Sequence, residues 1–104
     1  MKNKVATYMG FAAKARKIVT GYNTCIYMMG KKKVKLLVIA EDLSENSVKK
    51  TISAADKQHV PYRIYGSRDN LSHITGNVDK GIFGIVDDHF AKIISDEIDH
   101  IQSV

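Results

Sequence analysis

The chain has 104 residues, of which 44% are hydrophobic and 26% are charged, and this composition excludes both a disordered chain and a membrane-embedded one. Its one cysteine, Cys25, rules out an internal disulfide and a cysteine-based zinc site. Lysines near the start are not followed by the apolar segment of a secretory signal. We therefore expect one domain over residues 1–104, located in the cytoplasm.

Positive charge is concentrated in the first third of the sequence. Residues 1–35 contain nine Lys or Arg and no Asp or Glu, a charge of +9, whereas residues 36–104 contain seven bases and eleven acids, a charge of −4. Such segregation in a small domain predicts one positive side, and phosphates are the usual partners of such a side. A solvated, lysine-rich face is the alternative. Charge therefore favours a nucleic-acid partner without proving one.

Helix and strand patterns alternate from the start of the chain. Residues 3–17 carry apolar side chains at three- and four-residue spacing, which predicts an amphipathic helix. The β-branched residues 18–20 predict a short strand, and a second helix is expected from about residue 22 to residue 30. The apolar run 36–40 predicts a strand that is buried on both faces.

The same alternation continues through the second half. A third helix follows, for which Asp42 and Ser44 are both candidate caps. The patterns then predict a strand over 62–65, a short helix that ends at Gly76, a strand over 82–86, and a last helix capped by Asp87 or Asp88. This order predicts an α/β fold, a three-layer α/β/α sandwich with a four-stranded mixed sheet.

The sequence contains no specific catalytic or metal-binding motif. The four histidines never occur at the spacing that places two of them on one helix face, and the glycines are scattered as single turn residues. We therefore expect no enzymatic activity, no cofactor and no metal.

Two acidic pairs, Glu41–Asp42 and Asp87–Asp88, follow apolar strands, where open α/β sheets place their ligands. A metal-dependent phosphoacceptor domain that uses Glu41, Asp42 and Asp87 is therefore one alternative function. Capping of the third and last helices by Asp42 and Asp88 explains these residues more simply. Cys25 lies among apolar neighbours and is expected to fill the core rather than to act as a nucleophile.

The start of the second helix is the most informative region. Backbone N–H groups and the positive end of the helix dipole favour a phosphate there. Asn23, Thr24 and Tyr27 share one face, and the Asn23 amide can both donate and accept at base edges. Lysines at positions 31–33 follow one turn later. The alternative is structural, with Asn23 as a cap, Thr24 in solvent and Tyr27 as a half-buried ring.

Four stretches carry a resemblance to a known family: Ala13–Gly21, Lys35–Asp42, Val60–Tyr62 and Leu71–Gly76. Along nearly its whole length the chain resembles the bacterial branch of the kink-turn RNA-binding ribosomal family, relatives of the archaeal L-seven-Ae and eukaryotic L-thirty-e proteins. The resemblance implies an α/β/α sandwich and non-enzymatic binding of structured RNA, either ribosomal RNA or another kink-turn RNA.

The resemblance also implies which residues contact RNA. In this family the second helix enters a kinked stem beside sheared G·A pairs, through a Gly-x-Asn-Glu-x-x-Lys pattern. Gly21 and Asn23 match, whereas Thr24 replaces the usual Glu and Tyr27 the usual Lys. The loop after Gly76 corresponds to a family loop that packs on exposed bases. With basic residues as phosphate contacts, the expected RNA-binding residues are Lys14, Arg16, Lys17, Gly21, Asn23, Thr24, Tyr27, Lys31, Lys32, Lys33, Gly76, Asn77 and Val78.

A second class of function stays open beside RNA binding. The departures at Thr24 and Tyr27 favour a protein-interaction module on the same fold with weakened RNA binding. The charge of +9 over residues 1–35 favours RNA, and RNA binding is therefore our expectation.

Overall fold

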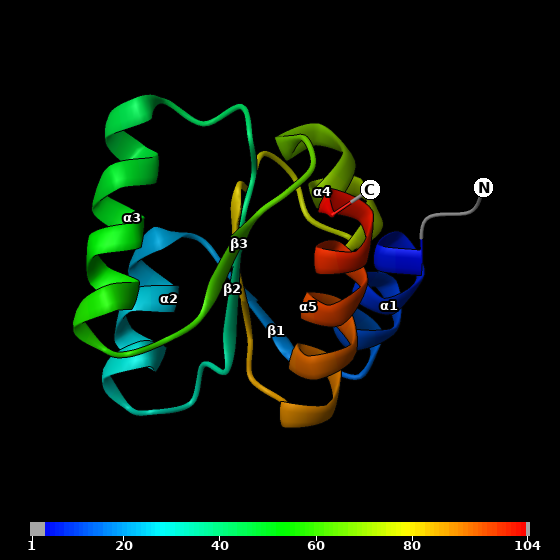
Figure 1. The fold of residues 1–104 in the computed structure, drawn as a ribbon, viewed down its shortest axis with the longest axis horizontal. Helices are drawn as coiled ribbons and strands as arrows, with labels where there is room; N and C mark the ends of the chain where they lie inside the picture. Colours follow the sequence, from blue (N-terminus) through cyan, green and yellow to red (C-terminus); the bar gives the residue numbers. More distant parts are fainter. Residues whose placement is uncertain (1–3, 104) are drawn as a thin grey trace.

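The computed structural model describes residues 4–103, in which a four-stranded sheet lies between two layers of helices (Figure 1). Helices α2 and α3 cover one face of the sheet, and α1, α4 and α5 cover the other. The predicted sandwich with a mixed sheet is therefore confirmed. In chain order the elements are α1 (Lys4–Lys14), β1 (Ile18–Thr20), α2 (Tyr22–Gly30), β2 (Leu36–Ile39), α3 (Glu45–Lys57), β3 (Tyr62–Ile64), α4 (Arg68–Ile74), β4 (Ile82–Ile85) and α5 (Asp88–Gln102).

The direction of β4 decides which loops lie together. The strand order is β1-β4-β2-β3, with β2 parallel to β3 and with β4 antiparallel to both β1 and β2. We call the end at which β1, β2 and β3 finish and β4 begins the upper end of the sheet, as drawn in Figure 1, and the opposite end the lower end. Helices α2, α3 and α4 begin at the upper end.

The two central strands lie in the middle of the core. All residues of β2 and β4 are buried, which confirms that the apolar run beginning at Leu36 is covered on both faces. On one side Phe83 and Ile94 belong to a cluster shared with α1 and α5. On the other side Leu37 and Met29 belong to a cluster shared with α2 and α3. Packing on both faces therefore fixes α2 against the sheet.

The first helix is shorter than its apolar pattern predicts. The predicted start at Asn3 lies outside the described residues, and α1 ends at Lys14 rather than at Lys17. Arg16 takes a positive φ of 60°, and the Lys17 amide donates to the Ala12 carbonyl at 2.8 Å. This left-handed turn closes the helix without the glycine that usually marks such an end.

Two of the expected helix caps are wrong. Ser44, not Asp42, caps α3, and its hydroxyl accepts from the Ser47 amide at 3.1 Å. Asp87 caps α5 through the Phe90 amide at 2.8 Å, so Asp88 is simply the first residue of that helix. In α3 the cap lies two residues after the expected Asp42, and in α5 it lies one residue before the expected Asp88.

Among residues 4–103, no helix is both long and apolar enough to span a membrane.

Candidate nucleic-acid interface

A glycine turn delivers the chain from β1 to α2. Gly21 has φ of 91°, a region that favours glycine, and it occupies the N-cap position. Its amide donates to the Ile82 carbonyl at 2.9 Å, which fixes the turn onto β4. Within residues 4–103 no side chain caps α2, and its first turn contains no acid. The first amides of α2 therefore remain for water or for a ligand.

The outer face of α2 is exposed along its whole length. Asn23 and Thr24 are exposed, and Asn23 does not cap the helix, contrary to the structural alternative. Tyr27 is 61% exposed rather than half-buried. One turn further on, the Lys31 ammonium lies 5.2 Å from the centroid of the Tyr27 ring, a cation–π contact. We call the row Asn23, Tyr27 and Lys31 the α2 strip.

Basic side chains that sequence reasoning missed surround the start of α2. The Lys80 ammonium lies 3.8 Å from the point where a Cβ on Gly21 would stand. Lys50 and Arg68 line the same hollow, which also contains Asp79. Asp79 pairs with Arg68 at 3.4 Å, so Lys50 and Lys80 supply the net positive charge. These lysines were missed because they belong to the acidic part of the sequence.

The loop 76–81 is held against the hollow by a buried serine. The Ser72 hydroxyl donates to the Lys80 carbonyl at 2.7 Å and accepts from the Lys80 amide at 2.8 Å. The Ser72 carbonyl accepts from the Asn77 amide at 2.7 Å, and the Asn77 side-chain amide donates to the Thr75 hydroxyl at 3.0 Å. Asn77 thus orders the loop, whereas Val78 is 85% exposed and projects from it. Gly76 follows α4 with φ of 74°.

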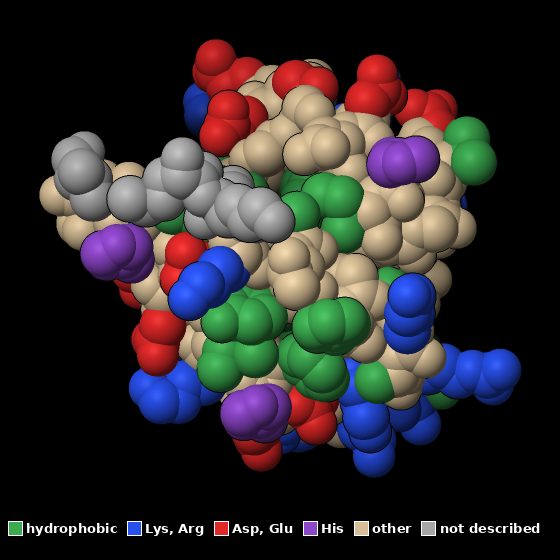
Figure 2. Space-filling view, turned by 90° about the vertical axis from the view of Figure 1, so that its right-hand side faces the viewer, with side chains coloured by type: hydrophobic (Ala, Val, Ile, Leu, Met, Phe, Trp, Pro, Cys, Tyr) green, Lys and Arg blue, Asp and Glu red, His purple; other side chains and the backbone are tan. Residues whose placement is uncertain are grey.

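The remaining predicted bases lie at the lower end of the sheet. Lys17 accepts through its carbonyl from the Val86 amide at 2.8 Å, and the Lys35 amide donates to the Ile85 carbonyl at 2.7 Å. Both lysines therefore flank the end of β4. Lys and Arg side chains gather at the lower right of Figure 2, on the face that carries α1, α4 and α5. Seven exposed bases belong to the segments at this lower end, which join α1 to β1 and α2 to β2. We call them the lower basic group: Lys14, Arg16, Lys17, Lys31, Lys32, Lys33 and Lys35.

The structure thus divides the predicted site between two places. Gly21, Asn23, Thr24 and the loop 76–78 lie at the upper end, whereas most of the predicted bases lie at the lower end. The α2 strip joins the upper and lower parts of the predicted site. These parts are about 13 Å apart along α2, the length of a helix of nine residues. Asp87 also lies at the lower end, so the charge there is not purely positive.

The phosphoacceptor alternative is wrong because its carboxylates lie at opposite ends of the sheet. Glu41 and Asp42 follow β2 at the upper end, whereas Asp87 follows the antiparallel β4 at the lower end. Glu41 accepts from the Gly66 amide at 3.1 Å, and Asp42 accepts from the Arg68 amide at 2.9 Å. These two acids therefore anchor the start of α4. Among residues 4–103 no group of three His, Cys, Asp or Glu could hold a metal ion.

Cys25 is confirmed as a core residue. Its side chain is buried in the cluster beneath α2, and its thiol lies 3.7 Å from the Val19 carbonyl, to which it donates. Burial raises the pKa of Cys25 to about 12. The nucleophilic thiolate is therefore suppressed at neutral pH.

Comparison with known proteins agrees with this architecture. Residues 3–95 match the model of the ribosomal protein L7Ae/L30e/S12e/Gadd45 family. The chain belongs to this family. It is 33% identical over 91 residues to the RNA-binding protein YlxQ of Enterococcus faecium, a match that covers 88% of this chain and 87% of that protein. It is 33% identical over 88 residues to the protein of the same name from Bacillus subtilis (strain 168), covering 84% and 88%.

Two solved structures have the same fold. A protein of unknown function from Bacillus halodurans C superimposes with a TM-score of 0.90 at 23% identity, covering 94% of this chain and 99% of that chain. The 15.5kD RNA binding protein of Giardia lamblia superimposes with a TM-score of 0.74 at 18% identity, covering 96% and 86%.

Proposed function

We propose that this protein binds structured RNA, without catalysis, through the α2 strip and the start of α2. The observation that carries the proposal is the uncapped start of α2 at Gly21, with the Lys80 ammonium beside it. Free amides, a helix dipole and a lysine together favour a phosphate group. Membership of the family and the names of the YlxQ relatives support RNA as the source of that phosphate.

The exposed side chains of α2 fit base edges better than phosphates alone. Asn23 can donate and accept at a purine edge, and the Thr24 hydroxyl can do so more weakly. Val78 offers an apolar contact to an unstacked base from the neighbouring loop. We infer that the preferred RNA is a kinked stem, in which a widened groove admits α2 and unpaired bases reach the loop.

The two-ended charge distribution implies a long RNA contact. A stem that begins at Gly21 and follows the α2 strip reaches Lys31 and then the lower basic group, whose other members supply further phosphate contacts. We propose ribosomal RNA or another kink-turn RNA in the cytoplasm as the partner, bound by one domain over residues 1–104.

The test is a titration of the protein with two stems of equal length, one kinked and one fully paired. We expect tighter binding of the kinked stem at moderate salt, where counterion release contributes less to affinity. Equal affinity for both stems would remove the kink-turn proposal and leave general RNA binding. No binding of either stem would remove RNA binding altogether.

A protein-interaction module is the second candidate, because the opposite face exposes an aromatic side chain. Phe11 on α1 is 57% exposed, and Figure 2 shows further hydrophobic side chains on that face. Exposed apolar patches of this kind often mark partner sites. Phe11→Ser should leave RNA affinity unchanged if the RNA lies on α2. A loss of RNA affinity would instead indicate that the RNA binds the face that carries α1.

A further inference from the structure

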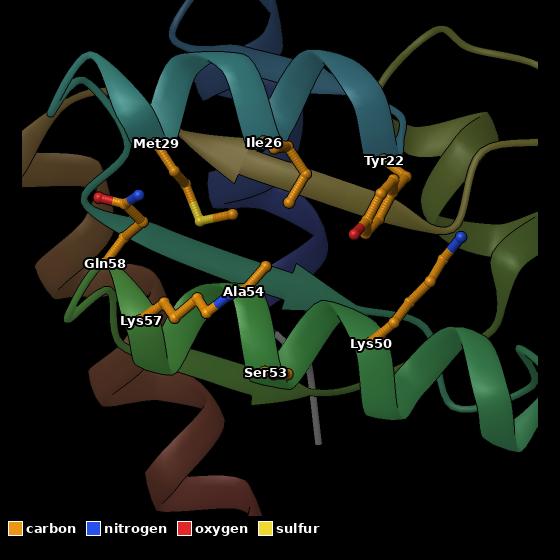
Figure 3. A pocket seen from close by; sticks show the side chains of 8 residues that line it. All are labelled: Tyr22, Ile26, Met29, Lys50, Ser53, Ala54, Lys57 and Gln58. Atoms are coloured by element: carbon orange, nitrogen blue, oxygen red, sulfur yellow. The ribbon is translucent and has the colours of Figure 1, made fainter.

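A groove separates α2 from α3 on the same face of the sheet (Figure 3). Its volume is about 380 Å³, within the range of about 300–1,000 Å³ that ligand sites occupy. Helix α2 lines it with Tyr22, Ile26 and Met29. Helix α3 and the residue after it supply Lys50, Ser53, Ala54, Lys57 and Gln58.

The two walls of the groove differ in chemistry. The α2 wall is largely apolar, whereas the α3 wall is polar, and each charged residue that lines the groove is a lysine. In Figure 3, Lys50 reaches toward Tyr22 at one end and Lys57 extends along the wall toward Ala54. Lys50 and Lys57 stand two helical turns apart, about 10.5 Å along the helix axis. This arrangement fits an anion that also carries a flat or apolar surface.

The groove is continuous with the proposed RNA interface. Tyr22 and Lys50 line both the groove and the hollow at the start of α2. The Lys50 ammonium lies 4.2 Å from the centroid of the Tyr22 ring, between the two hollows. An unpaired RNA segment that extends from the stem at Gly21 can therefore enter the groove past Tyr22 and Lys50. Within the described part of the chain, Asp79 is the one acidic residue that lines this route, and it pairs with Arg68.

We propose that the groove binds unpaired nucleotides of the same RNA whose folded part lies on α2, and this inference rests on the proposed function. Lys50 and Lys57 contact phosphates, and a base lies against Ile26, the partly exposed aliphatic residue of the α2 wall. An apolar wall selects single-stranded RNA, because a base inside a paired stem has both of its faces covered by its neighbours. The ligand is therefore a kinked stem with an unpaired extension rather than a blunt stem.

The test compares one kinked stem in two forms, blunt and with an unpaired extension of about four nucleotides, the lower limit of common single-strand sites. We expect the extension to raise affinity and to steepen the salt slope by about 1.4, since each neutralised single-strand phosphate contributes about 0.7. Lys57→Ala should remove about half of that increase in slope and leave the affinity for the blunt stem unchanged. Ser53→Glu, which adds negative charge to the groove, should remove the gain in affinity.

The matched control is Lys49→Ala on the same helix. Lys49 pairs with Glu45 at 3.2 Å and does not line the groove, so the gain from the extension should survive its removal. An equal loss in Lys49→Ala and Lys57→Ala would show that only general charge matters and would overturn the inference.

The remaining outcomes separate the inference from the proposed function. Binding of both RNA forms with equal affinity overturns the groove as a nucleotide site but leaves the α2 interface standing. Failure of the blunt stem to bind overturns both. Saturable binding of a free nucleoside monophosphate, with no gain from the extension, overturns the RNA extension in favour of a small-molecule ligand.

Discussion

Asn23 is the residue at which direct base recognition is most easily separated from general charge. Its side chain is exposed and is not used to cap α2. Replacing it with Ala should cost about 1–3 kcal/mol in binding a kinked stem, the range of one good base-edge contact. The ratio of the affinity for the kinked stem to the affinity for the paired stem should fall as well. Titration of both stems checks this, with Asn70→Ala on α4 as the control, since Asn70 is also exposed.

Thr24 allows two physical accounts to make opposite predictions. Thr24→Glu introduces the carboxylate common in the family but adds a negative charge to the first turn of α2, whose N-cap Gly21 lies beside Lys80. Plain electrostatics expects weaker binding of every RNA. If the new carboxylate accepts hydrogen bonds from guanine N–H groups, only the kinked stem should bind more tightly. We expect the second result, strengthened further by Tyr27→Lys; a uniform loss on both stems would argue against guanine contact at this position.

Sequence patterns predicted the turn at Gly21 and the exposed face of α2 but missed the basic residues beside them. Gly21 was predicted as a turn residue because glycine adopts positive φ, here 91°, without steric cost, directly after the β-branched strand. Lys50 and Lys80 were missed because a charge count by sequence segment places them among the acids. Asp42 was misassigned because its amide partner, on Arg68, is 26 residues away and invisible to a local pattern. Long-range hydrogen bonds of this kind need the fold.

At the scale of elements, the loop 76–81 depends on the helix that precedes it. Ser72→Ala removes both hydrogen bonds that join the buried Ser72 hydroxyl to the backbone of Lys80. The loss of two hydrogen bonds made by a buried hydroxyl should cost about 1–3 kcal/mol of folding free energy. Urea unfolding measures this loss, and affinity for the kinked stem should fall as well because Lys80 is no longer held beside Gly21.

The control for Ser72→Ala is the same substitution at Ser95 on α5, whose hydroxyl makes an exposed hydrogen bond. The Ser95 hydroxyl donates to the Lys92 carbonyl one turn earlier, at 3.1 Å. Ser95→Ala should therefore change stability by less than about 0.5 kcal/mol. Equal losses in the two variants would mean that Ser72 does not clamp the loop.

Helix and strand order followed from periodicity, whereas element ends did not. The buried strand beginning at Leu36 and the last helix were predicted because apolar spacing differs sharply between the two structures. The end of α1 was placed late because the pattern continues to Lys17, while the turn that ends the helix uses Arg16 in a left-handed conformation. Arginine at position 16 does not predict a left-handed turn, because glycine and asparagine are the residues that usually adopt it.

At the scale of the whole molecule, positive charge lies at both ends of the sheet. The bases of residues 14–35 lie at the lower end, whereas Lys50 and Lys80, from the acidic part of the sequence, lie beside the start of α2 at the upper end. Lys17 and Lys35 end up beside the last residues of β4, whereas Gly21 ends up beside its first. A charge count by sequence segment cannot show which distant residues meet in the fold, so one positive surface was expected where the structure has two. The consequence is that RNA length, and not only RNA shape, should decide how many lysines take part in binding.

Lys32→Ala tests this consequence directly. Lys32 belongs to the lower basic group, about the length of α2 away from Gly21. A kinked stem long enough to follow the α2 strip should bind this variant less tightly, with a salt slope flatter by about 0.9, the contribution of one duplex phosphate. A short kinked stem that ends near Tyr27 should bind the variant and the unaltered protein alike. Affinity measured at several salt concentrations with both stems provides the comparison.

The matched lysine for this experiment is Lys92 on α5, which pairs with Asp96 at 3.0 Å on the opposite face of the sheet. Lys92→Ala should leave both slopes unchanged, because a paired lysine away from α2 releases no counterion when RNA binds. If Lys32→Ala weakens the short and long stems equally, the lower basic group acts through the general field of the protein. If it weakens only the long stem, phosphates lie on the lower end itself, and the RNA runs the full length of α2.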